Sequence, residues 1–228
     1  MTDPVRLAKR VAEIFSCSRR EAEQYIEGGW VSVDGVINEE PAHRVSDAQV
    51  IALSPDATLG DVKPVTILLH KPAGIDLDAA RLLITPETLF ADDRSGIRFL
   101  KKHLANLQPT QPLETDASGL VVFTQDWTIT RKLVENANTV EHEYIAEVDG
   151  QIVADGLASL NTNLVKVSWQ NEKRLRFALK SAKPAQVAQL CKRVGLSVVS
   201  LKRIRIGRIP MAALPSGQWR YLYGYERF

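Results

Sequence analysis

A stretch rich in proline, glycine and aspartate, residues 54–64 (SPDATLGDVKP), divides this chain of 228 residues into a short part and a long part. Such a composition is typical of a connection rather than of a helix or a strand. Residues 1–53 are few for a self-sufficient hydrophobic core, whereas residues 65–228 suffice for a domain of ordinary size. The sequence therefore predicts a small N-terminal domain, a linker and a larger C-terminal domain.

Capping and turn signals predict two helices and a β-hairpin in the small domain. Ser18 and Glu21 have the spacing of a capping box, in which each side chain accepts a hydrogen bond from the backbone N–H of the other. Asp34-Gly35 is a strong signal for a two-residue hairpin turn between short apolar strands. The expected elements are helices over residues 5–15 and 19–27, and strands over residues 30–33, 36–37 and 50–53.

Strands and helices of the larger domain follow one another without a regular βαβ alternation, which favours an α+β fold. The expected strands cover residues 65–70, 120–124, 144–148, 165–169, 175–179 and 197–206. The expected helices cover residues 95–105, 128–136 and 183–194.

Basic residues are concentrated at the C-terminal end. Residues 171–228 contain 13 Lys and Arg but 2 acidic residues, a net charge of +11, whereas the remainder, with 16 basic and 25 acidic residues, has −9. This asymmetry indicates a polyanionic partner such as nucleic acid. A salt-bridged surface that packs against acidic segments is the alternative interpretation.

Several classes of protein are disfavoured by the composition. No apolar run reaches the roughly 18–20 residues that a membrane helix needs, and the first residues lack the apolar stretch of a secretory signal. Cys17 and Cys191 are far apart and form no CxxC pair, which argues against a zinc site and a disulfide framework. We therefore expect a cytoplasmic protein without metal.

The small domain resembles the alpha-L RNA-binding domain of ribosomal small-subunit protein four. The matching segments are residues 17–22 (CSRREA), 26–29 (IEGG) and 31–35 (VSVDG). Arg19 and Arg20 lie at the expected start of a helix, where free N–H groups and the helix dipole favour phosphate. We expect these two arginines to bind RNA, with Lys9 and Arg10 extending the same basic patch.

The larger domain resembles bacterial ribosomal RNA pseudouridine synthases of the RsuA and RluF type. The matching segments are residues 69–74 (LHKPAG), 113–126 (LETDASGLVVFTQD), 141–144 (EHEY), 201–207 (LKRIRIG) and 214–220 (LPSGQWR). The resemblance implies a mixed, mainly antiparallel β-sheet flanked by helices. It also implies an enzyme without cofactor or metal that isomerises uridine to pseudouridine in structured RNA. We expect the protein to be a monomer.

The resemblance implies a site with a carboxylate at the reacting sugar, an aromatic ring under the base and a basic residue beside the carboxylate. Glu114 occupies the position where the family has aspartate, and Asp116 is a second candidate two residues on. Tyr144 is the expected aromatic residue. The residues expected to contact RNA in this domain are Lys71, Arg203 and Arg205. Strand alternation predicts that Arg203 and Arg205 share one face and act together, either toward RNA or toward the Glu114 site.

The sequence departs from the family pattern around this site. The arginine that precedes the catalytic aspartate by two residues is Pro112 here. Positions where the family has arginines in a later helix are Ala185, Ala188 and Gln189. Two hypotheses follow: an active synthase that uses Glu114 or Asp116, and a catalytically degenerate relative that binds RNA without modifying it.

Overall fold

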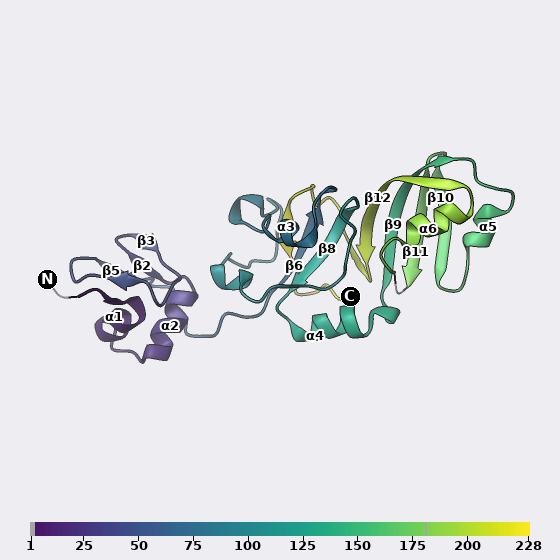
Figure 1. Cartoon of the computed structure of the whole chain (residues 1–228). Coiled ribbons are helices and arrows are strands. Elements are labelled where there is room, and N and C mark those ends of the chain that lie inside the picture. Colours follow the sequence, from purple (N-terminus) through teal and green to yellow (C-terminus); the bar gives the residue numbers. More distant parts are fainter. Residues whose placement is uncertain (1–2, 181) are drawn as a thin grey trace. The chain divides into compact units, whose positions relative to one another are not determined.

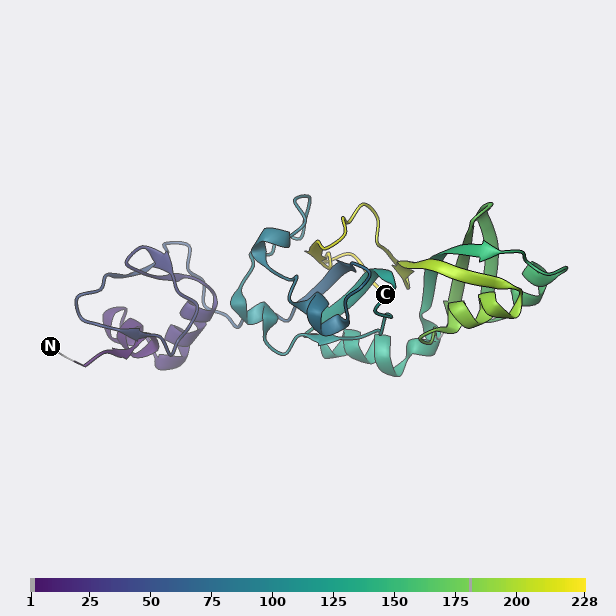
Figure 2. The same ribbon diagram turned by 45° about the horizontal axis from the view of Figure 1, so that its top comes forward.

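The computed structural model describes residues 3–180 and 182–228 and divides into two compact units (Figures 1 and 2). The first unit contains the chain up to Pro64 together with Arg98–Asn106. The second unit contains Val65–Ile97 and Leu107–Phe228. The chain thus returns to the first unit after it has entered the second.

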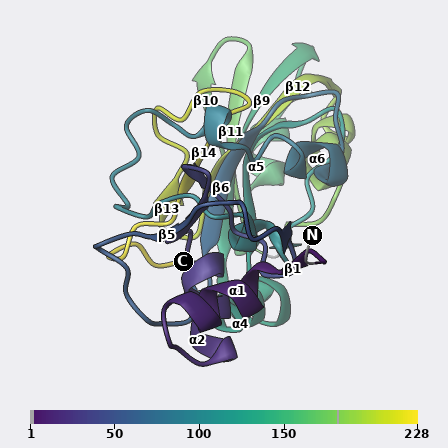
Figure 3. The ribbon, with the colours of Figure 1, turned by 90° about the vertical axis from the view of Figure 1, so that its left-hand side faces the viewer.

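Two helices and a small antiparallel sheet form the first unit. The helices α1 and α2 pack side by side (Figure 3), and the sheet has the strand order β3-β2-β5. The bounds are Leu7–Ile14 (α1), Arg19–Glu27 (α2), Val31–Val33 (β2), Val36–Ile37 (β3) and Ile51–Leu53 (β5). A separate strand pair, Val5–Arg6 (β1) with Arg44–Val45 (β4), takes the first two residues out of the expected helix. The core includes the fully buried Leu7, Val11 and Ile26.

Local signals in the sequence set these elements. The capping box is confirmed, because Ser18 Oγ accepts from the N–H of Glu21 at 3.2 Å and the Glu21 carboxylate accepts from the N–H of Ser18 at 2.7 Å. The hairpin turn is confirmed as well, with φ of 51° at Asp34 and 81° at Gly35. Two successive positive φ angles are those of a type I′ turn, whose twist matches that of the paired strands.

The segment Arg98–Asn106 packs within the first unit. The helix expected over residues 95–105 does not form. Gly96 has a φ of 69°, which no α-helix accommodates, and only the 3₁₀ turn Lys101–Leu104 (η2) forms. The Arg98 guanidinium lies 4.4 Å from the centre of the Trp30 ring, a cation–π contact. Contacts with residues distant in the sequence, rather than helical periodicity, therefore fix this segment.

A sheet of nine strands forms the second unit, with the main order β10-β11-β9-β12-β8-β6-β14 and with β13 and β7 at its margins. All pairings are antiparallel except that of β12 with β8. The strands are Thr66–Lys71 (β6), Gln108–Pro109 (β7), Ser118–Thr124 (β8), Glu141–Gly150 (β9), Val165–Asn171 (β10), Arg174–Lys180 (β11), Leu196–Ile206 (β12), Ile209–Pro210 (β13) and Trp219–Tyr221 (β14). The expected α+β fold with a mixed, mainly antiparallel sheet is confirmed.

Short helices flank this sheet, and α6 runs beside β12 (Figure 2). They are Leu77–Arg81 (α3), Pro86–Thr88 (η1), Trp127–Thr130 (α4), Arg131–Glu135 (η3), Ala137–Thr139 (η4), Gly156–Leu160 (α5) and Gln186–Arg193 (α6). The helix expected over residues 128–136 is α4 followed by the wider π-helical turn η3. No helix in the described ranges is long and apolar enough to span a membrane.

The core of the second unit lies where β6 and β8 pair. All six residues of β6 are buried, and this strand pairs on both sides, with β8 and with β14. The sequence of a strand that is covered on both faces of its sheet is a continuous apolar run and does not alternate between apolar and polar residues. Leu68, Leu120, Val122 and Ile206 belong to one buried cluster.

Candidate active site

The loop between β7 and β8 carries Glu114 and Asp116. The strand β8 begins directly after this loop and pairs with β12. In this parallel pairing Gly119 lies opposite Arg203. Gly119 has a φ of 117°, and a Cβ on it would lie 2.2 Å from the Arg203 carbonyl oxygen. Only glycine permits this close approach of two backbones. The loop therefore ends at a fixed point of the sheet.

Arg203 holds the loop from within the protein. Its side chain is fully buried. The guanidinium donates to the main-chain carbonyls of Leu120 (2.7 Å), Pro112 (3.0 Å) and Gln111 (3.3 Å). These carbonyls lie on both sides of Glu114 along the chain, so a single side chain fixes both ends of the loop.

Lys71, at the end of β6, is a second fully buried cation. Its Nζ donates to the main-chain carbonyls of Ile75 (2.6 Å), Pro72 (3.0 Å) and Thr115 (3.1 Å). Burial lowers the pKa of Lys71, the positive charge of Arg203 lowers it further, and Asp116 opposes the shift. Among the described residues, no carboxylate lies within 4.0 Å of the charged nitrogens of Lys71 or Arg203.

Glu114 is half-buried and turns toward the start of α6, whereas Asp116 is exposed. The Oε1 atom of Glu114 accepts a hydrogen bond of 2.6 Å from the backbone N–H of Ala185. Ala185 has a φ of 59° and directly precedes α6. This contact between residues 71 positions apart could not be read from the sequence.

Tyr144 lies on β9 directly opposite Arg203 on β12, so their side chains leave the sheet on the same face. The Tyr144 side chain is buried, with its hydroxyl 3.5 Å from Nδ1 of His142. Burial lowers the pKa of His142 to about 3, and the charges of Arg203 and Arg205 act in the same direction. The role of Tyr144 at a base remains a prediction.

Arg205 does not share a face with Arg203, so the expectation from strand alternation is wrong, whereas a joint role of the two arginines remains a prediction. A β-bulge between them places Arg205 opposite Glu143, which faces away from Tyr144. Arg205 donates to the carboxylates of Glu141 at 2.6 Å and Glu143 at 2.7 Å. The hydrogen bond from Arg205 lowers the pKa of Glu143, burial of this carboxyl group opposes the shift, and Arg176 lowers the pKa further.

Two of the residues expected to contact RNA are not available to it in this structure. Lys71 and Arg203 have no exposed surface and use their donors on main-chain carbonyls. A direct contact with phosphate would require these donors to leave the carbonyls, and binding of RNA by Lys71 and Arg203 remains a prediction. Their charge contributes instead to the position and the local potential of the loop that carries Glu114.

The basic residues expected to bind RNA in the first unit are exposed to different degrees. The side chains of Arg19 and Arg20 are 66% and 80% exposed, that of Lys9 is 65% exposed and that of Arg10 is 29% exposed. Arg6, Lys9, Arg19 and Arg44 line one shallow depression of about 420 Å³. The sequence analysis missed Arg6 and Arg44, because only the pairing of β1 with β4 brings them together. Binding of RNA by these residues remains a prediction.

Comparison with known proteins identifies both parts of the chain. A family model for the S4 domain matches residues 5–51, and one for RNA pseudouridylate synthase matches residues 65–199. The second match covers more than half of the chain. The chain therefore belongs to the RNA pseudouridylate synthase family, and the resemblance deduced from its sequence is confirmed.

The sequence similarity to known relatives extends over nearly the whole length of this chain. It is 27% identical to the dual-specificity RNA pseudouridine synthase RluF of Escherichia coli K12, over 96% of this chain and 75% of that protein. It is 25% identical to the ribosomal large subunit pseudouridine synthase B of Bacillus subtilis, over 97% and 93% of the two chains. A crystal structure of a pseudouridylate synthase superposes with a TM-score of 0.58 at 19% identity, over 96% of each chain, which supports the fold.

Proposed function

We propose that this protein isomerises uridine to pseudouridine in ribosomal RNA and that Glu114 supplies the carboxylate at the reacting sugar. One observation carries the proposal: Glu114, for which the sequence resemblance implies the place of the catalytic aspartate, lies half-buried on a loop that Arg203 fixes at both ends. The names of the relatives from E. coli and B. subtilis support RNA, and ribosomal RNA for the second, as the substrate.

The carboxylate of Glu114 uses one of its two oxygens within the protein. Its hydrogen bond with Ala185 uses Oε1 alone. Among the described residues, Oε2 has no hydrogen-bond partner, which leaves this oxygen for the substrate. A uridine flipped out of its helix, at a cost of a few kcal/mol, would present its ribose there.

The reaction exchanges one bond to C1′ for another. The bond from C1′ to N1 of uracil breaks, the base turns over, and a bond from C1′ to C5 forms. N1 ends with a proton and C5 loses one, so the product is an isomer of the substrate. A carboxylate beside C1′ stabilises the positive charge that develops on the sugar when the glycosidic bond breaks.

One observation favours a second candidate, an RNA-binding protein without catalytic activity. Among the described residues, Arg203 makes no ion pair with Glu114. Its guanidinium donates hydrogen bonds to main-chain carbonyls instead. Glu114 has one methylene more than aspartate, and a misplacement of about 1 Å can lower a rate about 100-fold. The carboxylate, bound by Ala185 alone among the described residues, would then serve to fix the start of α6.

Mapping of pseudouridine separates the two candidates. Purified protein is incubated with unmodified transcripts of both ribosomal RNAs, and pseudouridine is located by chemical labelling and primer extension. Conversion of a discrete uridine supports the enzyme. Retention of the transcript on the protein without conversion at any uridine supports the binding protein and rejects the enzyme.

A further inference from the structure

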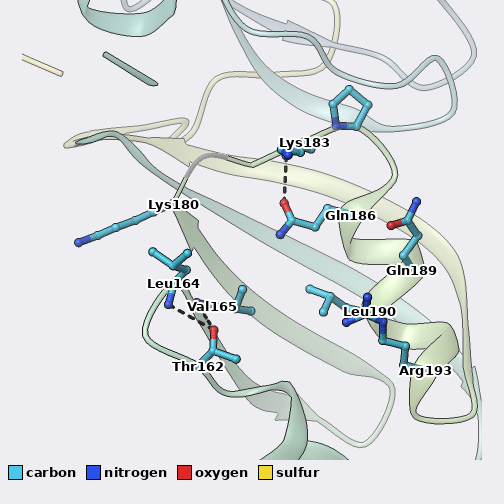
Figure 4. Close-up of a pocket in the computed structure, with 10 residues that line it drawn as sticks. Thr162, Leu164, Val165, Lys180, Lys183, Gln186, Gln189, Leu190 and Arg193 are labelled. Atoms are coloured by element: carbon cyan, nitrogen blue, oxygen red, sulfur yellow. Dashed lines mark hydrogen bonds between the residues drawn. The ribbon is translucent and has the colours of Figure 1, made fainter. Parts of the chain in front are cut away.

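A groove in the second unit lies between the β10–β11 hairpin and α6 (Figure 4). It encloses about 700 Å³, within the range of about 300–1,000 Å³ that small-molecule sites occupy. Its walls include the apolar residues Leu164, Val165, Pro184 and Leu190. Figure 4 shows Val165 and Leu190 pointing toward each other from opposite walls.

The charged residues that line this groove are all basic: Lys180, Lys183 and Arg193. All three are exposed, and none has a carboxylate within 4.0 Å among the described residues. Lys180 extends outward at the rim, whereas Arg193 lies on the α6 side (Figure 4). An open groove with apolar walls and unpaired cations fits a nucleic-acid strand, whose backbone is anionic and whose bases have flat faces that pack on apolar surfaces.

The groove adjoins the residue that binds Glu114. Pro184 and Gln186 line it, and between them in the chain stands Ala185, whose N–H donates to the Glu114 carboxylate. A strand seated in the groove would therefore pass beside the position proposed for the reacting sugar. The first turn of α6 has no basic residue of its own, because Ala188 and Gln189 stand there.

We propose that this groove binds the RNA strand that flanks the target uridine, with backbone phosphates on Lys180, Lys183 and Arg193. The inference rests on the proposed function, because it takes the neighbourhood of Glu114 as the place where uridine reacts. The cations at the groove supply the phosphate contacts that the start of α6 lacks.

The test compares two triple variants of equal charge. One carries Lys180→Ser, Lys183→Ser and Arg193→Ser. The control carries Lys166→Ser, Lys173→Ser and Lys192→Ser, which removes three exposed cations that do not line the groove. Binding to an unmodified transcript of large-subunit ribosomal RNA is measured over a range of salt concentrations.

Loss of three phosphate contacts to a single strand should reduce the slope of log K against log salt by about 2. We expect this reduction, and an affinity lower by at least tenfold at low salt, in the groove variant but not in the control. Equal affinities and slopes for the two variants would overturn the inference.

Failure of this inference and failure of the proposed function give different results. Binding requires no turnover, so a protein that forms no pseudouridine but depends on the groove for RNA refutes the proposed function alone. A protein that forms pseudouridine but binds equally well in both triple variants refutes the groove alone.

Discussion

The carboxylate of Glu114 accepts a hydrogen bond of 2.6 Å from the main-chain N–H of Ala185, so one side chain joins the loop before β8 to the start of α6. Because the donor is a backbone group, this contact requires the carboxylate but not a particular side chain at position 185. The sequence has lost the arginines expected near this site, yet the carboxylate keeps a defined position.

Arg203 should be essential to the stability of the second unit. In Arg203→Lys, a single ammonium group replaces the planar guanidinium group, which donates hydrogen bonds to three carbonyls. Buried carbonyls without a partner cost about 1–3 kcal/mol each, so we expect a loss of about 2–5 kcal/mol in the free energy of unfolding, measured with urea. The control is Arg205→Lys, whose side chain is 25% exposed and whose loss should stay below about 1 kcal/mol. Equal losses would contradict the role of Arg203.

His142 should make stability depend on pH. Its pKa is about 3 in the folded protein, against 6.5 as the ordinary value. Between these pH values the unfolded chain binds a proton that the folded one does not, so stability is complete above about pH 6.5 and falls as the pH falls toward 3. From pH 6.5 to pH 5 the contribution of this one group is about 2 kcal/mol.

The measurement for His142 is a pair of urea titrations, at pH 7 and at pH 5, on the wild-type protein and on His142→Phe. The variant keeps a ring at this buried position but has no group to titrate. We expect the wild type to lose about 2 kcal/mol more than the variant. If both proteins lose the same amount, His142 takes up its proton equally in both states and the argument fails.

Arg19 and Arg20 should bind RNA phosphates from the start of α2. In the double variant Arg19→Ala and Arg20→Ala, affinity for unrelated RNA sequences should fall, and the slope of log K against log salt should decrease by about 1.5–2. Arg131→Ala with Arg174→Ala is the control, because both side chains are exposed and lie in the second unit. Unchanged affinity of the first double variant at low salt would rule out the proposed contacts.

Much of the fold could be predicted because its signals are local. The capping box of Ser18 and Glu21 and the turn at Asp34-Gly35 involve residues close in the sequence, and both form as expected. The strand β6 could be predicted from its continuous apolar run. The helix expected over residues 95–105 was wrong because contacts such as that of Arg98 with Trp30 outweigh local periodicity.

The candidate site could be predicted only in part, because its geometry depends on register. Simple alternation places the side chains of Arg203 and Arg205 on one face of the sheet, but the bulge between them turns the Arg205 side chain to the opposite face. Lys71 stands beside a turn in the sequence, where a phosphate ligand is a reasonable expectation, yet the structure buries it under three carbonyls. Neither a bulge nor the burial of a lysine has a reliable local signal.

The central claim is that Glu114 is the catalytic carboxylate, and its most direct test is the rate of pseudouridine formation in Glu114→Gln. The control is Asp116→Asn, which makes the same chemical change at the exposed rival carboxylate two residues on. We expect Glu114→Gln to lower the single-turnover rate on a ribosomal RNA transcript by at least about 100-fold, while Asp116→Asn stays close to the wild type. A measurable wild-type activity that survives intact in Glu114→Gln and disappears in Asp116→Asn would contradict the claim.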